Sequence, residues 1–147
     1  MIVRPLEPAD VPAVIALWQE VGDYHEEMDN PATLRRKAER DPGLFLVAEE
    51  AGWIVGTVMG GFDGRMGTIG RLAVAADRRR QGLARQLMQE LEDRLKQKGA
   101  AAVSLLVEQE NDAAISLYRD IGYVSFEDVL YMRKLLAPQR AKDGKEA

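Results

Sequence analysis

The segment with the clearest chemical potential joins a predicted strand to a predicted helix and reads LAVAADRRRQGLA, residues 72–84. The start of a helix presents unpaired backbone N–H groups and the positive end of the helix dipole, which together favour phosphate. Gly82 lets an anion approach the backbone closely, and the small Ala84 keeps that approach open. The segment therefore indicates a phosphate site, and an ordinary connection with a solvated arginine run is the alternative.

Two other phosphate-binding motifs do not fit this segment. A P-loop would end in Gly-Lys-Ser or Gly-Lys-Thr, and neither tripeptide occurs in the chain. A dinucleotide fingerprint would need Gly-x-Gly-x-x-Gly between strand and helix, whereas this turn contains one glycine. A P-loop enzyme and a Rossmann dehydrogenase are therefore disfavoured.

The elements that must position this turn alternate along the chain. Hydrophobic patterning predicts strands at residues 2–6, 44–49, 54–62, 68–74 and 102–107, with one or two closing strands in residues 123–136. Helices are predicted at residues 10–21, 30–40 and 82–98, and a last helix begins at Asn111 or Asp112 and stops at Gly122. Residues 23–30 are predicted to be a loop. This order indicates an α/β or α+β fold with a mixed sheet.

Length and composition limit the other possibilities. The 147 residues suit one domain, predicted to span residues 1–137, and residues 138–147 are predicted to be a charged, disordered tail. The absence of cysteine and the single histidine disfavour a disulfide framework or a multi-histidine metal centre. No signal peptide and no apolar run of roughly 18 residues is present, so a cytoplasmic location away from membranes is expected. The net charge of -4 disfavours a nucleic-acid partner.

Two sequence blocks resemble the GCN5-related N-acetyltransferase (GNAT) superfamily. RRQGLA, residues 79–84, matches that family's Arg/Gln-x-x-Gly-x-Gly/Ala motif. NDAAISLYRDIGY, residues 111–123, matches its second signature, an Asn, a helix bearing Leu-Tyr and a Gly-aromatic pair. The resemblance covers nearly all of residues 2–136. Within the superfamily the chain most resembles the YpeA-type acetyltransferases, through residues 44–49, 56–61 and 63–64.

The resemblance implies a mixed, mostly antiparallel central sheet flanked by about four helices. It also implies acetyl-CoA as co-substrate, with no metal. In this family the strand before the motif pairs with the pantetheine arm, and the turn holds the pyrophosphate. The residues expected to contact the cofactor are Leu72, Ala73, Val74, Arg79, Arg80, Gln81, Gly82, Leu83, Ala84, Asn111 and Tyr118.

The catalytic residues implied by the resemblance are Tyr118 and, less directly, Glu108. A phenol can supply a proton to a departing thiolate, which suits Tyr118 as general acid, and a core tyrosine is the alternative. Some relatives place a catalytic glutamate where this chain has Leu106. Glu108 or Glu110 could serve as a base through water, although a solvated position near a helix start is the alternative for both.

The acceptor is less well defined by sequence. Arg71 could attract an anionic acceptor or could pair with a nearby carboxylate on the sheet. Trp18 has core-like helical spacing, and His25 has the character of a loop residue. The expected acceptor is a small-molecule amine or a protein amino group, and a homodimer is possible. A regulatory CoA-binding protein and a nucleotide or nucleic-acid binder that uses Arg78–Arg80 are the competing functions.

Overall fold

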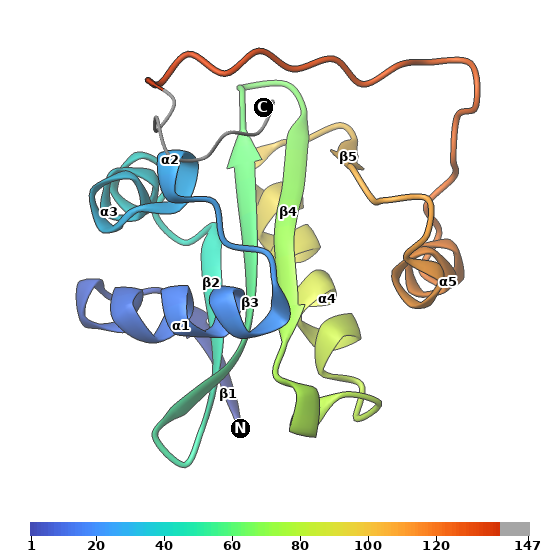
Figure 1. Ribbon diagram of the computed structural model, residues 1–147. Coiled ribbons are helices and arrows are strands. Elements are labelled where there is room, and N and C mark those ends of the chain that lie inside the picture. The colour runs from blue at the N-terminus through green and yellow to red at the C-terminus, as the bar shows by residue number, and fades with distance from the viewer. Residues whose placement is uncertain (139–147) are drawn as a thin grey trace.

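The computed structural model describes residues 1–138 and contains one five-stranded sheet. Its strands are β1 (Ile2–Pro5), β2 (Phe45–Glu50), β3 (Trp53–Phe62), β4 (Gly67–Val74) and β5 (Val103–Leu105). They lie in the order β1-β2-β3-β4-β5 (Figure 1). The first four strands are antiparallel to their neighbours, and β5 runs parallel to β4. The predicted mixed, mostly antiparallel sheet is therefore confirmed.

Four of the helices agree with the sequence prediction. They are α1 (Val11–Val21), α3 (Pro31–Arg40), α4 (Leu83–Lys98) and α5 (Asp112–Asp120). A further short helix, α2 (Glu26–Asp29), lies within the segment predicted to be a loop, so that prediction is wrong for these four residues. The backbone N–H of Asp29 donates to the His25 carbonyl at 2.7 Å, and the His25 N–H donates to the Asp29 carboxylate at 2.9 Å. These two bonds close the turn. Single 3-10 turns precede α1 and α4, at Pro8–Asp10 and Ala76–Arg78.

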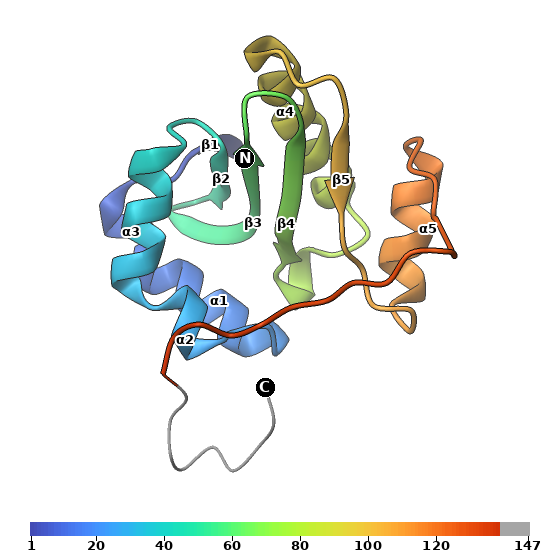
Figure 2. The ribbon, with the colours of Figure 1, turned by 90° about the horizontal axis from the view of Figure 1, so that it is seen from above.

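Helices cover both faces of the sheet, with α4 on one face and α1 and α3 on the other (Figure 2). The α4 face is filled by the predicted leucine stripe, whose members are at most 3% exposed: Leu83, Leu87, Met88, Leu91 and Leu95. On the opposite face Trp18 stacks on Phe45, with ring centroids 6.0 Å apart. Both rings are almost fully buried, as predicted for Trp18.

Strand β4 contains a β-bulge and then leaves its neighbour β5. Ala73 pairs with Thr57 and Gly70 pairs with Met59, so two residues, Arg71 and Leu72, lie opposite the single residue between them on β3. Pairing with β5 extends from Gly67 only to Ile69. From residue 70 to residue 74 the edge of β4 that faces β5 therefore has no strand beside it within residues 1–138.

The end of the chain departs from the prediction. β5 is shorter than residues 102–107, and the predicted strand is not covered on both faces, since Ser104 within β5 is exposed and Leu106 and Val107 beyond it are 66% and 36% exposed. The closing strands predicted for residues 123–136 are absent from the described part of the chain. Their aromatic and β-branched residues suit a strand, but a strand needs a paired backbone. This segment instead crosses from α5 to α2 (Figures 1 and 2), where Arg133 Nη1 lies 3.9 Å from Met28 Sδ.

Residues 139–147, most of the predicted tail, lie outside the described residues, and the domain boundary at residue 137 stays a prediction. No helix among residues 1–138 is long and apolar enough to cross a membrane.

Candidate active site

The divergence of β4 and β5 opens a groove of about 1530 Å³. One side is lined by β4 and the turn into α4, and the other by the end of β5 and by α5. The remaining end is lined by residues of the α1–α3 connection (residues 22–30) and by Tyr131 and Arg133. Segments distant in sequence therefore meet in one groove, and both signature blocks contribute residues to its lining.

The turn into α4 presents free backbone donors to this groove. Gly82 precedes the 16-residue helix in a left-handed conformation, with φ of 79°. The first backbone hydrogen bond of the helix runs from the Gln86 N–H to the Gly82 carbonyl, at 3.0 Å. The N–H groups of residues 82–85 therefore have no partner inside the helix, and they lie at the positive end of its dipole. Such a helix start can bind a phosphate or pyrophosphate.

The neighbouring arginines are not a uniformly solvated run. Arg78 forms an ion pair with Glu50 at 2.6 Å, and Arg79 Nε donates to the Val74 carbonyl at 3.2 Å. Arg80 forms no ion pair within residues 1–138 and has a positive φ of 64°. All three line the groove, whereas Gln81 does not. The predicted cofactor residues of the turn are thus brought together, apart from Gln81.

The strand residues that were predicted to contact the cofactor, Leu72, Ala73 and Val74, also line the groove. The Ala75 N–H donates to the Val55 carbonyl of β3 at 2.9 Å. Since backbone groups alternate sides along a strand, the backbone groups of Val74 face away from β3 and toward the groove, where the Val74 carbonyl accepts from Arg79 Nε and the Val74 N–H remains for an extended ligand.

Tyr118 lines the groove from α5 and is half-buried. Burial raises the pKa of its phenol above the usual value of 10.0. Its hydroxyl donates to no other described residue, and its ring lies 5.8 Å from that of Tyr123. The Tyr123 hydroxyl in turn donates to Glu92 of α4 at 2.6 Å. Tyr118 therefore packs beside α4 and keeps its hydroxyl unbonded, so the core and the functional interpretations both have support.

The segment before α5 places its polar residues unequally. Asn111 lines the groove, and its Oδ1 accepts from the Ala114 N–H at 3.2 Å, which makes it the N-cap of α5. Glu108 lines the groove and is exposed, whereas Glu110 is exposed and does not line it. Leu106, at the position of a glutamate in some relatives, lines the groove and has no group that accepts a proton. Glu108 is thus the better placed of the two carboxylates.

Sequence analysis missed the partners of Arg71. This side chain forms ion pairs with Asp23 and Asp29, so Arg71 does pair with carboxylates, but they belong to the α1–α3 connection and not to the sheet as predicted. Asp23 and Met28 also line the groove, as do Tyr131 and Arg133 from the end of the chain. No motif or spacing marked these residues. Within residues 1–138, no group of three or more His, Asp or Glu side chains is placed to hold a metal ion.

Comparisons with known proteins agree with this geometry. The model of the acetyltransferase (GNAT) family matches residues 13–123. An acetyltransferase of Yersinia enterocolitica is 35% identical over 139 residues, which cover 95% of this chain and 99% of that protein. The ribosomal-protein-alanine N-acetyltransferase of Brucella melitensis has a similar structure, with a TM-score of 0.69, 25% identity and coverage of 83% of each chain. The PaiA N-acetyltransferase of Thermoplasma acidophilum, solved with coenzyme A, shares the fold, with a TM-score of 0.71 at 20% identity and coverage of 82% of this chain and 87% of that one.

Fold, groove and relatives define an acyl-transferring enzyme. The chain belongs to the acetyltransferase (GNAT) family and is an N-acetyltransferase. The finer resemblance to YpeA-type enzymes stays a prediction.

Proposed function

We propose that the groove binds acetyl-CoA, with the pyrophosphate at the N–H groups of residues 80–84 and the pantetheine arm along residues 72–74 of β4. The observation that carries this proposal is that two sets of backbone groups lie along one groove. N–H groups without a partner inside the helix lie at the start of α4, and the edge of β4 beyond Ile69 has no paired strand within residues 1–138, although the Val74 carbonyl accepts from Arg79 Nε. The PaiA protein, of the same fold, was solved with coenzyme A, which agrees with a CoA ligand.

The proposed reaction is direct transfer of the acetyl group. The lone pair of a neutral amine attacks the thioester carbonyl carbon, a C–N bond forms and the C–S bond breaks. The departing sulfur takes a proton from the Tyr118 hydroxyl, which lines the groove without a hydrogen-bond partner in residues 1–138. The ammonium formed by attack returns a proton to Tyr118 or to water, so that an amide and a free thiol remain. Burial raises the pKa of Tyr118 above its usual value of 10.0, so the phenol is protonated near neutral pH and can act as the general acid.

Deprotonation of the acceptor is proposed to proceed through water. An alkyl ammonium has a pKa near 10.4, so only a small fraction is neutral at pH 7. Leu106 cannot remove the proton, and Glu108 is an exposed carboxylate at the groove. We propose that Glu108 receives the proton through water without being indispensable.

The acceptor is proposed to be a primary amine that enters at the end of the groove lined by Gly22, Asp23, Met28, Tyr131 and Arg133. The Brucella relative acts on the alanine of a ribosomal protein, according to its name, so a protein α-amino group and a small amine are both candidates. A homodimer and a cytoplasmic location stay predictions.

Calorimetry and a transfer assay test this function together. Titration with acetyl-CoA and with CoA measures binding, and release of free thiol measures transfer to spermidine, L-lysine and a short peptide with a free α-amino group. We expect binding of both CoA ligands and transfer to at least one amine. Failure to bind either CoA ligand would overturn the proposal. Binding without amine-dependent thiol release, in a wider amine panel as well, would favour a regulatory CoA-binding protein.

A further inference from the structure

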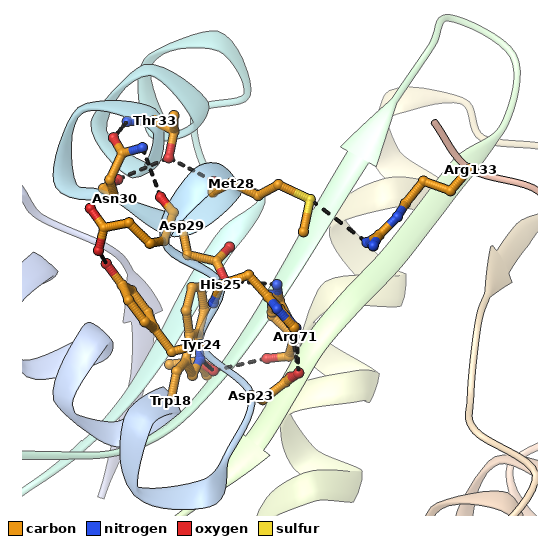
Figure 3. Close-up of polar contacts among 12 residues, drawn as sticks. Trp18, Asp23, Tyr24, His25, Met28, Asp29, Asn30, Thr33, Arg71 and Arg133 are labelled. Carbon is orange, nitrogen blue, oxygen red and sulfur yellow. Dashed lines mark hydrogen bonds and ion pairs between the residues drawn. The ribbon is translucent and has the colours of Figure 1, made fainter. Parts of the chain in front are cut away.

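Two carboxylates from the α1–α3 connection converge on a single arginine of the sheet (Figure 3). Arg71 Nη1 lies 2.9 Å from Asp23 Oδ1, and Arg71 Nη2 lies 2.7 Å from Asp29 Oδ2. Both aspartates belong to the α1–α3 connection, whereas Arg71 belongs to β4. The guanidinium group therefore joins this connection to the strand that forms the floor of the groove.

Arg71 is itself held in one place. Its carbonyl accepts from the Thr57 hydroxyl at 2.8 Å, and Thr57 accepts from Trp18 Nε1 at 2.9 Å. Its guanidinium carbon lies 5.2 Å from the centroid of the Trp18 ring, within the range of a cation–π contact. The positive φ of 54° at Arg71 is uncommon for a residue with a side chain and persists only where surrounding contacts impose it. The bulge and the guanidinium group therefore form one fixed unit.

The connection depends on this unit because Asp29 is buried. Asp29 is 3% exposed, and the oxygen that contacts Arg71 also accepts the His25 N–H. A buried carboxylate that loses its cation is costly, because neither water nor another charge compensates it. Without Arg71, residues 22–30 would have to move to expose Asp29 to water. Asp23 is more exposed, at 46% of its side chain, and would lose its anchor as well.

We propose that Arg71 is a positioning residue for the acceptor, which fixes residues 22–30 against the β4 bulge and so sets the shape of the acceptor end of the groove. This inference rests on the proposed function, which assigns that end to the acceptor. Gly22, Asp23 and Met28 line the groove beside Arg71 itself. Because the guanidinium group is occupied by two carboxylates, its contribution is to place the loop rather than to bind an anionic substrate.

The chain contains a matched control for this arrangement. Arg4 also joins two carboxylates, Asp10 at 2.7 Å and Glu49 at 2.9 Å, and its side chain is 23% exposed compared with 19% for Arg71. Arg4 does not line the groove. Arg71→Met and Arg4→Met therefore remove equivalent double ion pairs, one at the acceptor end and one away from it.

Hydrogen exchange of the backbone amides tests the positioning directly. In Arg71→Met we expect exchange in residues 22–30 to accelerate by at least about tenfold, with residues 83–98 unchanged, because a buried carboxylate has lost its partner. Arg71→Lys should show a smaller effect, since lysine keeps the charge without the planar fork. Arg4→Met should leave residues 22–30 unchanged. Equal exchange in wild type and Arg71→Met, or the same acceleration in Arg4→Met, would overturn the proposal.

The second measurement is the steady-state kinetics of acetyl transfer. It uses the amine of the panel that gives the fastest transfer. In Arg71→Met the KM for that amine should rise by about tenfold or more, while the Kd for acetyl-CoA stays within about threefold, since misplacement affects the acceptor alone. An unchanged amine KM would overturn the proposal. If Arg71→Met does not fold, Arg71→Lys replaces it, and the same direction of change in exchange and in amine KM is required. Exchange needs no acceptor, so failure of wild type to bind acetyl-CoA would overturn the proposed function instead.

Discussion

The two glycines that flank α4 allow two effects of a glycine substitution, loss of phosphate binding and backbone strain, to be measured separately. Gly82 precedes the helix with φ of 79°, and Gly99 follows it with φ of 100°. A Cβ atom added at either glycine would meet nothing within 4 Å. Gly82 lines the groove and Gly99 does not. Gly82→Ala and Gly99→Ala therefore impose the same kind of strain at opposite ends of one helix.

The expected magnitudes follow from this geometry. A left-handed alanine costs about 1–2 kcal/mol, so both variants should lose a similar amount of folding free energy. In Gly82→Ala the new methyl group, or the backbone rotation that relieves its strain, also disturbs the N–H groups beside the pyrophosphate. A hydrogen bond to a charged group contributes about 1.5–3 kcal/mol, and loss of one such bond weakens binding by about 10- to 100-fold.

Urea denaturation first measures the stability of each variant. Calorimetric titration of the folded variants with acetyl-CoA then tests the phosphate assignment. We expect the Kd of Gly82→Ala to rise by about 10- to 100-fold and that of Gly99→Ala to stay within about twofold of wild type. If the two variants bind acetyl-CoA equally well at equal stability, the free N–H groups at the start of α4 do not hold the pyrophosphate.

Three further outcomes are expected. Tyr118→Phe should bind acetyl-CoA normally but transfer acetyl roughly 100- to 10,000-fold more slowly. In wild type the rate should begin to fall at alkaline pH only above pH 10.0, since burial raises the pKa of the Tyr118 phenol. If Tyr118→Phe turns over at close to the wild-type rate while chemistry is rate-limiting, Tyr118 is not the general acid. Glu108→Gln and Glu110→Gln should each keep kcat/KM within about tenfold of the wild-type value across the pH range. A loss of several hundredfold in either variant would be as large as the contribution of general base catalysis and would reveal a dedicated base. The hydrogen bond from Arg4 holds the pKa of Asp10 below 3.8 against the opposing effect of burial, so this carboxylate stabilises the fold above that pH and the stabilisation is lost as pH falls through the lowered pKa. The fall in Tm on acidification below pH 4 should therefore be smaller in Asp10→Asn, and identical acid profiles would contradict this linkage.

Helix α4 shows what local sequence can predict. Leucines at every fourth position give one apolar stripe, and glycines at both ends stop the helix in left-handed conformations. These signals lie within the segment itself, so the bounds Leu83–Lys98 agree with the predicted range. The strand before the turn is equally local, and most of the residues predicted to contact the cofactor lie along one groove.

The acceptor end depends on contacts between distant residues, and the sequence carried no signal for them. Arg71 meets Asp29 across 42 positions of sequence, and Met28 meets Arg133 across 105. The course of residues 123–136 was mispredicted for a related reason, since composition favours a strand there but does not specify a partner. Gln81 belongs to a matching motif, yet its place outside the groove lining depends on how the turn folds.

The bulge in β4 also shifts the phase of the strand. Ile69 packs against the α4 face, and the next residues to do so are Leu72 and Val74, whereas Ala73 packs on the α1 face. A regular strand would have placed Ala73 with Ile69, because side chains alternate with a period of two. The extra residue of the bulge therefore decides which face these side chains occupy. Deletion of Arg71 would restore regular pairing with β3 and leave Leu72, Ala73 and Val74 on their present faces, whereas a regular strand that kept Arg71 would turn Leu72 and Val74 to the α1 face. Insertions should be tolerated in the hairpin at residues 51–52, whose residues are exposed.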